Sequence, residues 1–238
     1  MSAALSADRG RSVFCNVPFD EPYLPLLRAM LFTIHSCGFV ARTALEDMGG
    51  AEQRLHKIIR LIGESRYSIH DLSRVTLDKV SQLPRANMPF EAGIAMGAIH
   101  FGHGPRQHRD LLILCGKAHQ DKAFLSDLAG QDSRAHDGDP RKLIEHVRGF
   151  LAAKAGWDGS AVAGDEIARR YKAFQRDLPR LAKQLGTSAQ TLLEFAYLND
   201  WLRMVARWLP DAATSAAPAT PPAHKRAARK RAVAAKTS

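Results

Sequence analysis

The sequence predicts a doubly wound α/β fold, a parallel sheet of about five strands followed by a C-terminal helical hairpin. Over the first 156 residues, short apolar runs alternate with stretches whose apolar residues recur at three- and four-residue spacing. Residues 110–115 (DLLILC) are apolar at nearly every position, as a strand covered on both faces must be. After Gly156, two long helical patterns follow with no strand pattern between them. Strands alternating with helices indicate a parallel sheet.

Each expected strand is short and bounded by turn-forming residues. The first ends at Pro18, which cannot donate to a sheet ladder, and Asp20 then offers an N-cap for the next helix. Gly38 closes that helix. The expected strands are Ser12–Val17, Phe39–Leu45, Arg66–Leu72, Asp110–Cys115 and, with a weaker pattern, Asp132–His136. The expected helices are Glu21–Ser36, Ala51–Ser65, Met88–Phe101, Asp121–Leu128 and Pro140–Lys154.

The C-terminal part is expected to form two helices, Gly164–Leu185 and Ser188–Leu209, which dock on the α/β domain through Trp201 and Trp208. The turn between them also resembles that of a DNA-binding helix-turn-helix, because a glycine permits it and Thr187 or Ser188 would cap the second helix. That second helix reads AQTLLEFAYLNDWLRM, which is apolar and acidic where a DNA reader should be basic. A packed hairpin is therefore favoured over a DNA-reading motif.

The chain is expected to divide into a disordered N-terminus (residues 1–10), an α/β domain (11–156), a helical hairpin (157–210) and a disordered basic tail (211–238). The tail holds six Lys and Arg against one Asp, so it supplies half of the net charge of +10. It has no aromatic residue and few large aliphatic ones, so it cannot bury enough surface to become ordered. Such a tail either contacts nucleic acid weakly and nonspecifically or only keeps the protein in solution.

The remaining composition narrows the class of protein. No apolar run of the sequence is long enough to span a bilayer, so no membrane partner is expected. No apolar secretory segment is seen near the N-terminus, and the three cysteines form no CxxC pair, which together favour a reducing cytoplasm. The ten histidines lack metal-ligand spacing, and GxGxxG, GxxxxGK[ST] and GxSxG motifs are absent. No metal and no bound cofactor are therefore predicted.

A candidate site follows from the topology. In open parallel sheets, ligands bind beyond the carboxyl ends of the strands, near the point where the strand order reverses. This rule selects the loop after the first strand, the loop after the third strand and the start of the following helix. The candidate binding residues on these segments are Asn16, Phe19, Asp20, His70, Ser73, Arg74, Arg85 and Asn87.

Two carboxylates in these segments are the candidate catalytic residues. Glu91 is expected in the first turn of its helix, where the dipole and free N–H groups stabilise an ionised carboxylate, and it either acts chemically or completes the helix cap. Asp71 ends a strand, where it would bind ribose hydroxyls, orient a base or cap the next turn. His70 and Asp71 are adjacent on a strand and should point to opposite faces, so His70 is a second-choice acid or base.

Three short motifs together resemble one superfamily. They are Pro18-Phe19-Asp20 after a strand, Ile69-His70-Asp71-Leu72 at the end of a strand, and Phe90-Glu91-Ala92-Gly93 at a helix start. In this order and spacing they are similar to the bacterial TIR-like and nucleoside 2-deoxyribosyltransferase-like proteins. The resemblance covers roughly residues 12–116.

The resemblance implies a flavodoxin-like domain that cleaves the N-glycosidic bond of NAD or a related nucleoside or nucleotide. Glu91 would be the nucleophile or would stabilise the oxocarbenium ion, with Asp71 contacting the ribose or base. NAD or a nucleotide would then be a substrate rather than a cofactor, and the protein could assemble into a homo-oligomer. Three alternatives stay open: a nucleotide-binding sensor or interaction module without turnover, for example in antiphage defence, a DNA-associated regulator, and an enzyme acting on a phosphate or sugar.

Overall fold

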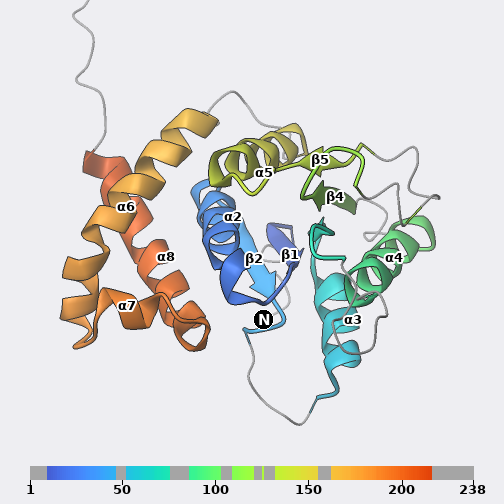
Figure 1. Ribbon diagram of the computed structural model, residues 1–238, viewed down its shortest axis with the longest axis horizontal. Coiled ribbons are helices and arrows are strands. Elements are labelled where there is room, and N and C mark those ends of the chain that lie inside the picture. The colour runs from blue at the N-terminus through green and yellow to red at the C-terminus, as the bar shows by residue number, and fades with distance from the viewer. Residues whose placement is uncertain are drawn as a thin grey trace, which may run out of the picture.

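The computed structural model describes residues 10–46, 52–75, 86–102, 109–120, 125, 132–154 and 162–215, with only the backbone described for 211–215. Its centre is a five-stranded, all-parallel sheet with the strand order β2-β1-β3-β4-β5 (Figure 1). The strands are β1 (Ser12–Asn16), β2 (Val40–Thr43), β3 (Tyr67–Asp71), β4 (Asp110–Cys115) and β5 (Arg134–Ala135). The predicted α/β fold is confirmed, including the weakest strand candidate.

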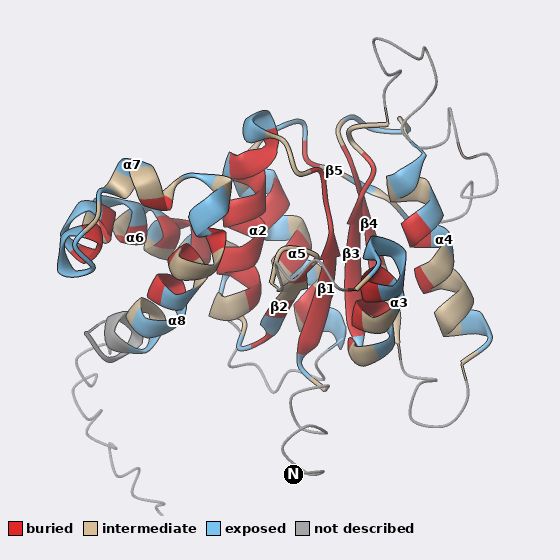
Figure 2. Ribbon diagram, turned by 90° about the horizontal axis from the view of Figure 1, so that it is seen from below, coloured by how far each residue is buried: buried red, intermediate tan, exposed pale blue. Residues whose placement is uncertain are grey.

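Helices cover both faces of the sheet. The 3-10 turn η1 (Glu21–Tyr23) leads into α2 (Leu24–Ser36), which packs with α5 (Pro140–Lys154) on one face. Helices α3 (Arg54–Glu64) and α4 (Asn87–His100) pack together on the other face, as Figure 2 shows. The predicted helix at Asp121–Leu128 lies outside the described residues apart from Leu125.

Alternation along β1 divides the core into these two layers. Val13 and Cys15 belong to the large cluster that includes α2 and α5, whereas Phe14 packs with Ile58 and Ala95 from α3 and α4. Successive side chains of a strand point to opposite faces, so this division extends to the polar residues at the strand ends.

The C-terminal helices differ from the prediction after Gln184. Helix α6 (Gly164–Gln184) forms as expected, but the single helix predicted over Ser188–Leu209 is wrong. The chain instead forms α7 (Ala189–Leu192), the 3-10 turn η5 (Phe195–Tyr197) and α8 (Leu198–Ser215).

The break occurs at Leu193 and Glu194, for a tertiary reason. The buried Arg28 guanidinium of α2 donates a hydrogen bond to the Leu193 carbonyl, and Glu194 is extended, with φ −85° and ψ 155°. A continuous recognition helix after the Gly186 turn is therefore absent from this described segment. Helix α8 also continues through Pro210 to Ser215, so residues 211–215, predicted as tail, are helical. A proline removes one backbone donor, but the residues after it can still form helical hydrogen bonds.

Aromatic side chains dock the C-terminal helices on α2. Phe174 of α6 lies with its ring centroid 5.6 Å from Phe32 and 5.6 Å from Trp201, which is buried. Trp208 lies 6.2 Å from Phe32 and donates a hydrogen bond of 2.9 Å to Asp177. The predicted docking on the α/β domain is confirmed for Trp208, whereas Trp201 packs on Phe174 of α6 within the same core. Within the described part of the chain, no helix combines the length and the apolar character needed to cross a membrane.

Candidate functional site

The strand order reverses between β1 and β3. From β1 the chain first adds β2 on one side and then crosses to β3 on the other, so the segments after β1 and β3 flank the switch point. Nucleotides bind at this position in flavodoxin-like sheets. Asn16 ends β1, and His70 and Asp71 end β3 in a register that pairs Asn16 with His70. The described polar side chains at this edge form two separate clusters.

The first cluster lies on the α4 side of the sheet. The Asn16 amide nitrogen lies 3.0 Å from His70 Nδ1 and donates a hydrogen bond of 3.2 Å to the Met88 carbonyl in the first turn of α4. Asn16 is 2 % and His70 0 % exposed. The Met88 carbonyl can only accept, so the Asn16 nitrogen faces it and donates to His70 Nδ1 as well. The His70 proton is therefore on Nε2.

Two atoms of this cluster have no hydrogen-bond partner among the described residues. They are Asn16 Oδ1, an acceptor, and His70 Nε2, a donor. Burial lowers the pKa of His70 to about 3, so its imidazole is neutral at physiological pH. Buried polar groups are nearly always paired in native proteins, so each one left unpaired calls for a partner such as a water molecule, an ion or a ligand. Here they provide one acceptor and one donor.

Glu91 lies on the sheet-facing side of α4, together with the buried Ala92 and Ala95. It is only 5 % exposed, and no hydrogen bond joins it to the described residues. Burial raises the pKa of the Glu91 carboxyl, and the charge of Arg54 on α3 opposes this in part. The Glu91 carboxyl therefore takes up a proton more readily than the carboxyl of an exposed glutamate does.

The expected position of Glu91 in the first helical turn is wrong. Helix α4 starts at Asn87, and its first backbone bond runs from the Phe90 N–H to the Ala86 carbonyl. Glu91 therefore follows the free N–H groups and can neither cap the helix nor be held ionised by them. Its raised pKa agrees with this position.

The second cluster, centred on Asp71, lies on the α2 and α5 side. The Ser73 N–H donates to Asp71 Oδ1 at 2.8 Å, the Tyr23 hydroxyl donates to Oδ2, and His136 Nε2 lies 3.1 Å from Oδ2. The Gly138 N–H donates to His136 Nδ1 at 3.0 Å, so the His136 proton is on Nε2 and faces Asp71. Tyr23, Asp71 and His136 are all at most 2 % exposed.

These hydrogen bonds decide the charge of Asp71. Burial by itself would raise the pKa of the carboxyl, but the bonds from His136, Ser73 and Tyr23 outweigh it, and the pKa is lowered. Asp71 is a buried carboxylate whose two oxygens already accept bonds from the protein. It ties together the segments that follow β1, β3 and β5.

Asp71 and Glu91, which the sequence predicts in one site, lie on opposite sides of the sheet. Asp71 contacts groups on the α2 and α5 side, whereas Glu91 lies on α4, across the sheet (Figure 2). The predicted divergence of His70 and Asp71 is confirmed, and it explains this outcome: the residue of β3 that faces α4 is His70.

The other predicted binding residues take local structural roles. Asp20 caps η1 through the Tyr23 N–H at 3.0 Å and lies 3.5 Å from the Arg74 guanidinium. Phe19 packs against Phe195 with 6.5 Å between the ring centroids, and the backbone N–H of Ser73 donates to Asp71 Oδ1. Asn87 is exposed at the start of α4, and Arg85 lies outside the described residues.

Sequence reasoning missed three residues at this edge. Tyr23 and His136 complete the Asp71 cluster, and Gln120 Oε1 accepts from the N–H groups of Gly116 and Lys117 at 3.1 and 3.2 Å. The available signal was position, because His136 directly follows the last strand. No local motif distinguishes these side chains from ordinary polar residues.

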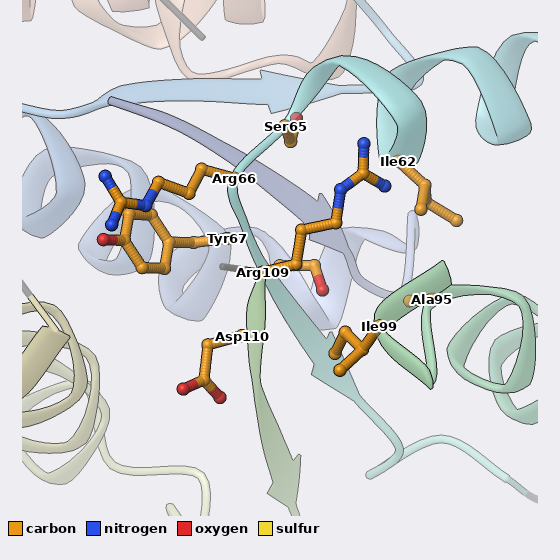
Figure 3. Close-up of a pocket in the computed structure, with 9 residues that line it drawn as sticks. Ile62, Ser65, Arg66, Tyr67, Ala95, Ile99, Arg109 and Asp110 are labelled. Atoms are coloured by element: carbon orange, nitrogen blue, oxygen red, sulfur yellow. The ribbon is translucent and has the colours of Figure 1, made fainter. Parts of the chain in front are cut away.

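A small cavity lies at the opposite end of the sheet. It holds about 10 Å³ and is lined by residues at the start of β3 and β4, including Tyr67 and Asp110. Arg109 extends across it toward α3 (Figure 3), where its guanidinium donates to the Gly63 carbonyl. A space of this size holds one water molecule at most, so it does not compete with the carboxyl edge as a nucleotide site.

The chain matches no protein-family model, no curated protein and no solved structure. In the described ranges, no three His, Cys, Asp or Glu side chains converge as a metal site would require.

Proposed function

We propose that the protein cleaves the N-glycosidic bond of NAD or a related nucleotide or nucleoside, with Glu91 as the catalytic carboxylate. The observation that carries this proposal is the buried Glu91 carboxyl on the sheet-facing side of α4, beside the topological switch point. Its supporting features are the unpaired Asn16 Oδ1 and His70 Nε2 at the same edge.

The chemistry needs one carboxylate at the anomeric carbon. When the C1′–N bond breaks, the base leaves with the bonding electrons and positive charge develops on C1′ and the ring oxygen. The Glu91 carboxylate would stabilise that charge or attack C1′, and water would then add there with loss of a proton. A site shielded from solvent strengthens this electrostatic effect.

The neutral His70 and Asn16 would bind the substrate without adding charge. Asn16 Oδ1 accepts a hydrogen bond and His70 Nε2 donates one, a combination that suits a ribose hydroxyl or the amide of a base. Asp71 acts only indirectly in this scheme, because it holds the segments after β1, β3 and β5 in place. The proposal keeps the other expectations from the sequence: a cytoplasmic protein that assembles into a homo-oligomer.

A nucleotide-binding module without turnover is the second candidate. The observation that favours it is the full engagement of Asp71, whose two oxygens accept bonds from the protein and so do not reach a substrate. A site with one carboxylate and one neutral imidazole can bind a nucleotide without any efficient proton donor for the leaving base.

Mass spectrometry of the full chain incubated with a panel of NAD, nucleosides and deoxynucleosides separates the two candidates. The expected result is release of a free base that falls at least about 100-fold in Glu91→Gln. The control is Glu145→Gln, which neutralises an exposed glutamate of α5 and should leave the rate unchanged. The assay is repeated at protein concentrations up to about 100 µM, so that an oligomer with a dissociation constant on the order of 10 µM would form.

Product release that is equal in wild type and Glu91→Gln would exclude Glu91 as the catalytic group. Thermal stabilisation by a nucleotide without any product would instead establish the binding module. Neither product nor stabilisation with any member of the panel would contradict both candidates.

A further inference from the structure

The positive charge of the chain is concentrated in its C-terminal third. Residues 162–238 contain 14 of the 34 Lys and Arg but only six of the 24 Asp and Glu, a net +8, whereas residues 1–161 carry a net +2. The tail explains +5 of this excess, and α6 carries the remaining +3, because residues 185–210 are neutral on balance. The structure shows how these charges are arranged on α6.

Five basic residues follow one face of α6. They are Arg169, Lys172, Arg176, Arg180 and Lys183, at successive spacings of three, four, four and three residues. At 100° per residue they fall within an arc of about 80°, and they span about 21 Å of the helix. All five are exposed, on the side away from the buried residues such as Phe174 and Leu178. We call this surface the α6 basic stripe.

Three of the five charges of the stripe form no ion pair with a described neighbour. Arg169 lies 2.6 Å from Glu166, and Arg180 lies 3.7 Å from Asp177, which also accepts the Trp208 hydrogen bond. No ion pair joins Lys172, Arg176 or Lys183 to another residue of the described ranges. Like charges four residues apart on a helix destabilise it slightly, so the stripe brings the isolated protein no advantage.

We propose that the α6 basic stripe binds the phosphodiester backbone of double-stranded DNA without reading its sequence. Cations aligned over about 21 Å match the phosphates along roughly six base pairs, since a duplex rises about 3.4 Å per pair. Single-stranded nucleic acid is bound mainly by stacking on aromatic rings, and the aromatic residues of α6, Tyr171 and Phe174, are buried.

This surface differs from the one that a helix-turn-helix would use. The segment after Gly186 breaks at Leu193 and Glu194, and it presents Glu194 to solvent. The α6 basic stripe lies on the preceding helix and carries contacts to phosphate rather than to base edges. The proposal is independent of the nucleotide site at the carboxyl edge of the sheet.

Fluorescence anisotropy of a labelled 20-base-pair duplex, titrated with the full chain at several salt concentrations, tests the proposal. The variant Lys172→Gln/Arg176→Gln/Lys183→Gln removes the three unpaired charges. It should weaken binding at least about tenfold near 0.1 M salt, and the slope of log K against log salt should fall by about 0.9 for each lost phosphate contact. A duplex of scrambled sequence should bind equally well.

The matched control removes the same net charge elsewhere. Arg11→Gln/Arg66→Gln/Lys154→Gln changes three exposed cations of the α/β domain and should alter the dissociation constant less than twofold. Glu91→Gln should bind DNA like the wild type, so a failure of this proposal is distinguishable from a failure of the proposed enzymatic activity. Equal weakening by both triple variants would mean that only net charge matters, and it would overturn the proposal.

A second full-length variant separates the stripe from the tail. Gln replaces the six tail cations, Lys225, Arg226, Arg229, Lys230, Arg231 and Lys236. Residual binding that still depends on the α6 basic stripe supports the proposal. Complete loss in the tail variant, with no effect of the α6 changes, would assign binding to the tail and overturn it. Tighter binding to anionic lipid vesicles or to single-stranded DNA than to the duplex would overturn it as well.

Discussion

The two polar clusters at the carboxyl edge of the sheet are built from similar residues but differ in how completely they are hydrogen-bonded. Around Asp71, each carboxylate oxygen accepts a hydrogen bond, from the Ser73 N–H and the Tyr23 hydroxyl, and His136 Nε2 lies 3.1 Å from Oδ2. Around Asn16 and His70, one acceptor and one donor stay buried without a described partner, and the Glu91 side chain makes no hydrogen bond to the residues that the structure describes. The first arrangement stabilises the fold, whereas the second keeps polar atoms available for a ligand at a cost in stability.

Because its cluster is the more completely hydrogen-bonded, Asp71 should be the residue whose replacement lowers the stability of the protein most. Asp71→Asn should lower the free energy of unfolding by about 3 kcal/mol, because it removes a buried charge whose partners are then left unpaired. Urea denaturation followed by circular dichroism measures the change. Asp132→Asn is the control, since that carboxylate is 78 % exposed in its ion pair with Arg134 and its loss should not be measurable. A similar stability of both variants would show that the Asp71 cluster does not hold the edge together.

His70 should make the protein sensitive to mild acid. Its pKa is lowered from 6.5 to about 3, so the unfolded chain binds the proton first. The stability that this group contributes is therefore complete above pH 6.5 and is lost as the pH falls, by about 1.4 kcal/mol per pH unit. Denaturation curves between pH 7 and pH 4 measure the slope.

The variant His70→Asn, which has no titratable group at this position, should flatten that slope whatever its stability at pH 7. The Asp71 contribution falls in a separate window, because a lowered carboxyl pKa gives stability that is lost only as the pH falls below the ordinary aspartate pKa of 3.8. An unchanged slope in His70→Asn would contradict the burial of a neutral imidazole.

Tyr23→Phe tests one bond of the Asp71 cluster. Removing the hydroxyl leaves Asp71 with His136 and the Ser73 N–H, so we expect a loss of about 1.5–2 kcal/mol, as for other hydrogen bonds to charged groups. Thermal and urea denaturation provide the measurement. Tyr197→Phe, at a 38 % exposed tyrosine, is the matched control and should be neutral. A neutral Tyr23→Phe would indicate that the hydroxyl is bound to solvent instead.

Glu91→Gln should change the free energy of unfolding least, and it should raise that free energy rather than lower it. The raised pKa of Glu91 means that its contribution to stability is complete below the ordinary glutamate pKa of 4.5. That contribution is lost as the pH rises through the pKa of the folded protein. At pH 7 the neutral amide should therefore stabilise the protein, by less than about 1 kcal/mol because the carboxyl is partly screened by solvent.

The same urea series at pH 4 and pH 7 checks this prediction, with Glu145→Gln as the exposed control. The advantage of Glu91→Gln should shrink at pH 4, where the wild-type carboxyl is largely protonated. A loss of stability at pH 7 would show that Glu91 is a structural residue like Asp71, and it would break the distinction between the two clusters.

The sequence by itself determined most of the architecture. Apolar alternation and helical periodicity located all five strands and the flanking helices, because burying one face of each element imposes those periods locally. The divergence of His70 and Asp71 also followed from strand geometry alone. Pro18 and Asp20 marked the end of β1 and the start of η1 through backbone chemistry that acts within a few residues.

Only the tertiary structure decided how the polar residues are partnered. Tyr23, Asp71 and His136 come from three segments more than 45 residues apart in sequence, and no local rule predicts which hydroxyl or imidazole meets a given carboxylate. The helix predicted over Ser188–Leu209 is interrupted at Leu193, whose carbonyl accepts a hydrogen bond from Arg28, 165 residues away in sequence. Glu91 was identified as a candidate from sequence, but its burial, its position beyond the free N–H groups and its separation from Asp71 depend on how α4 packs on the sheet, because burial and charge are properties of the assembled layers.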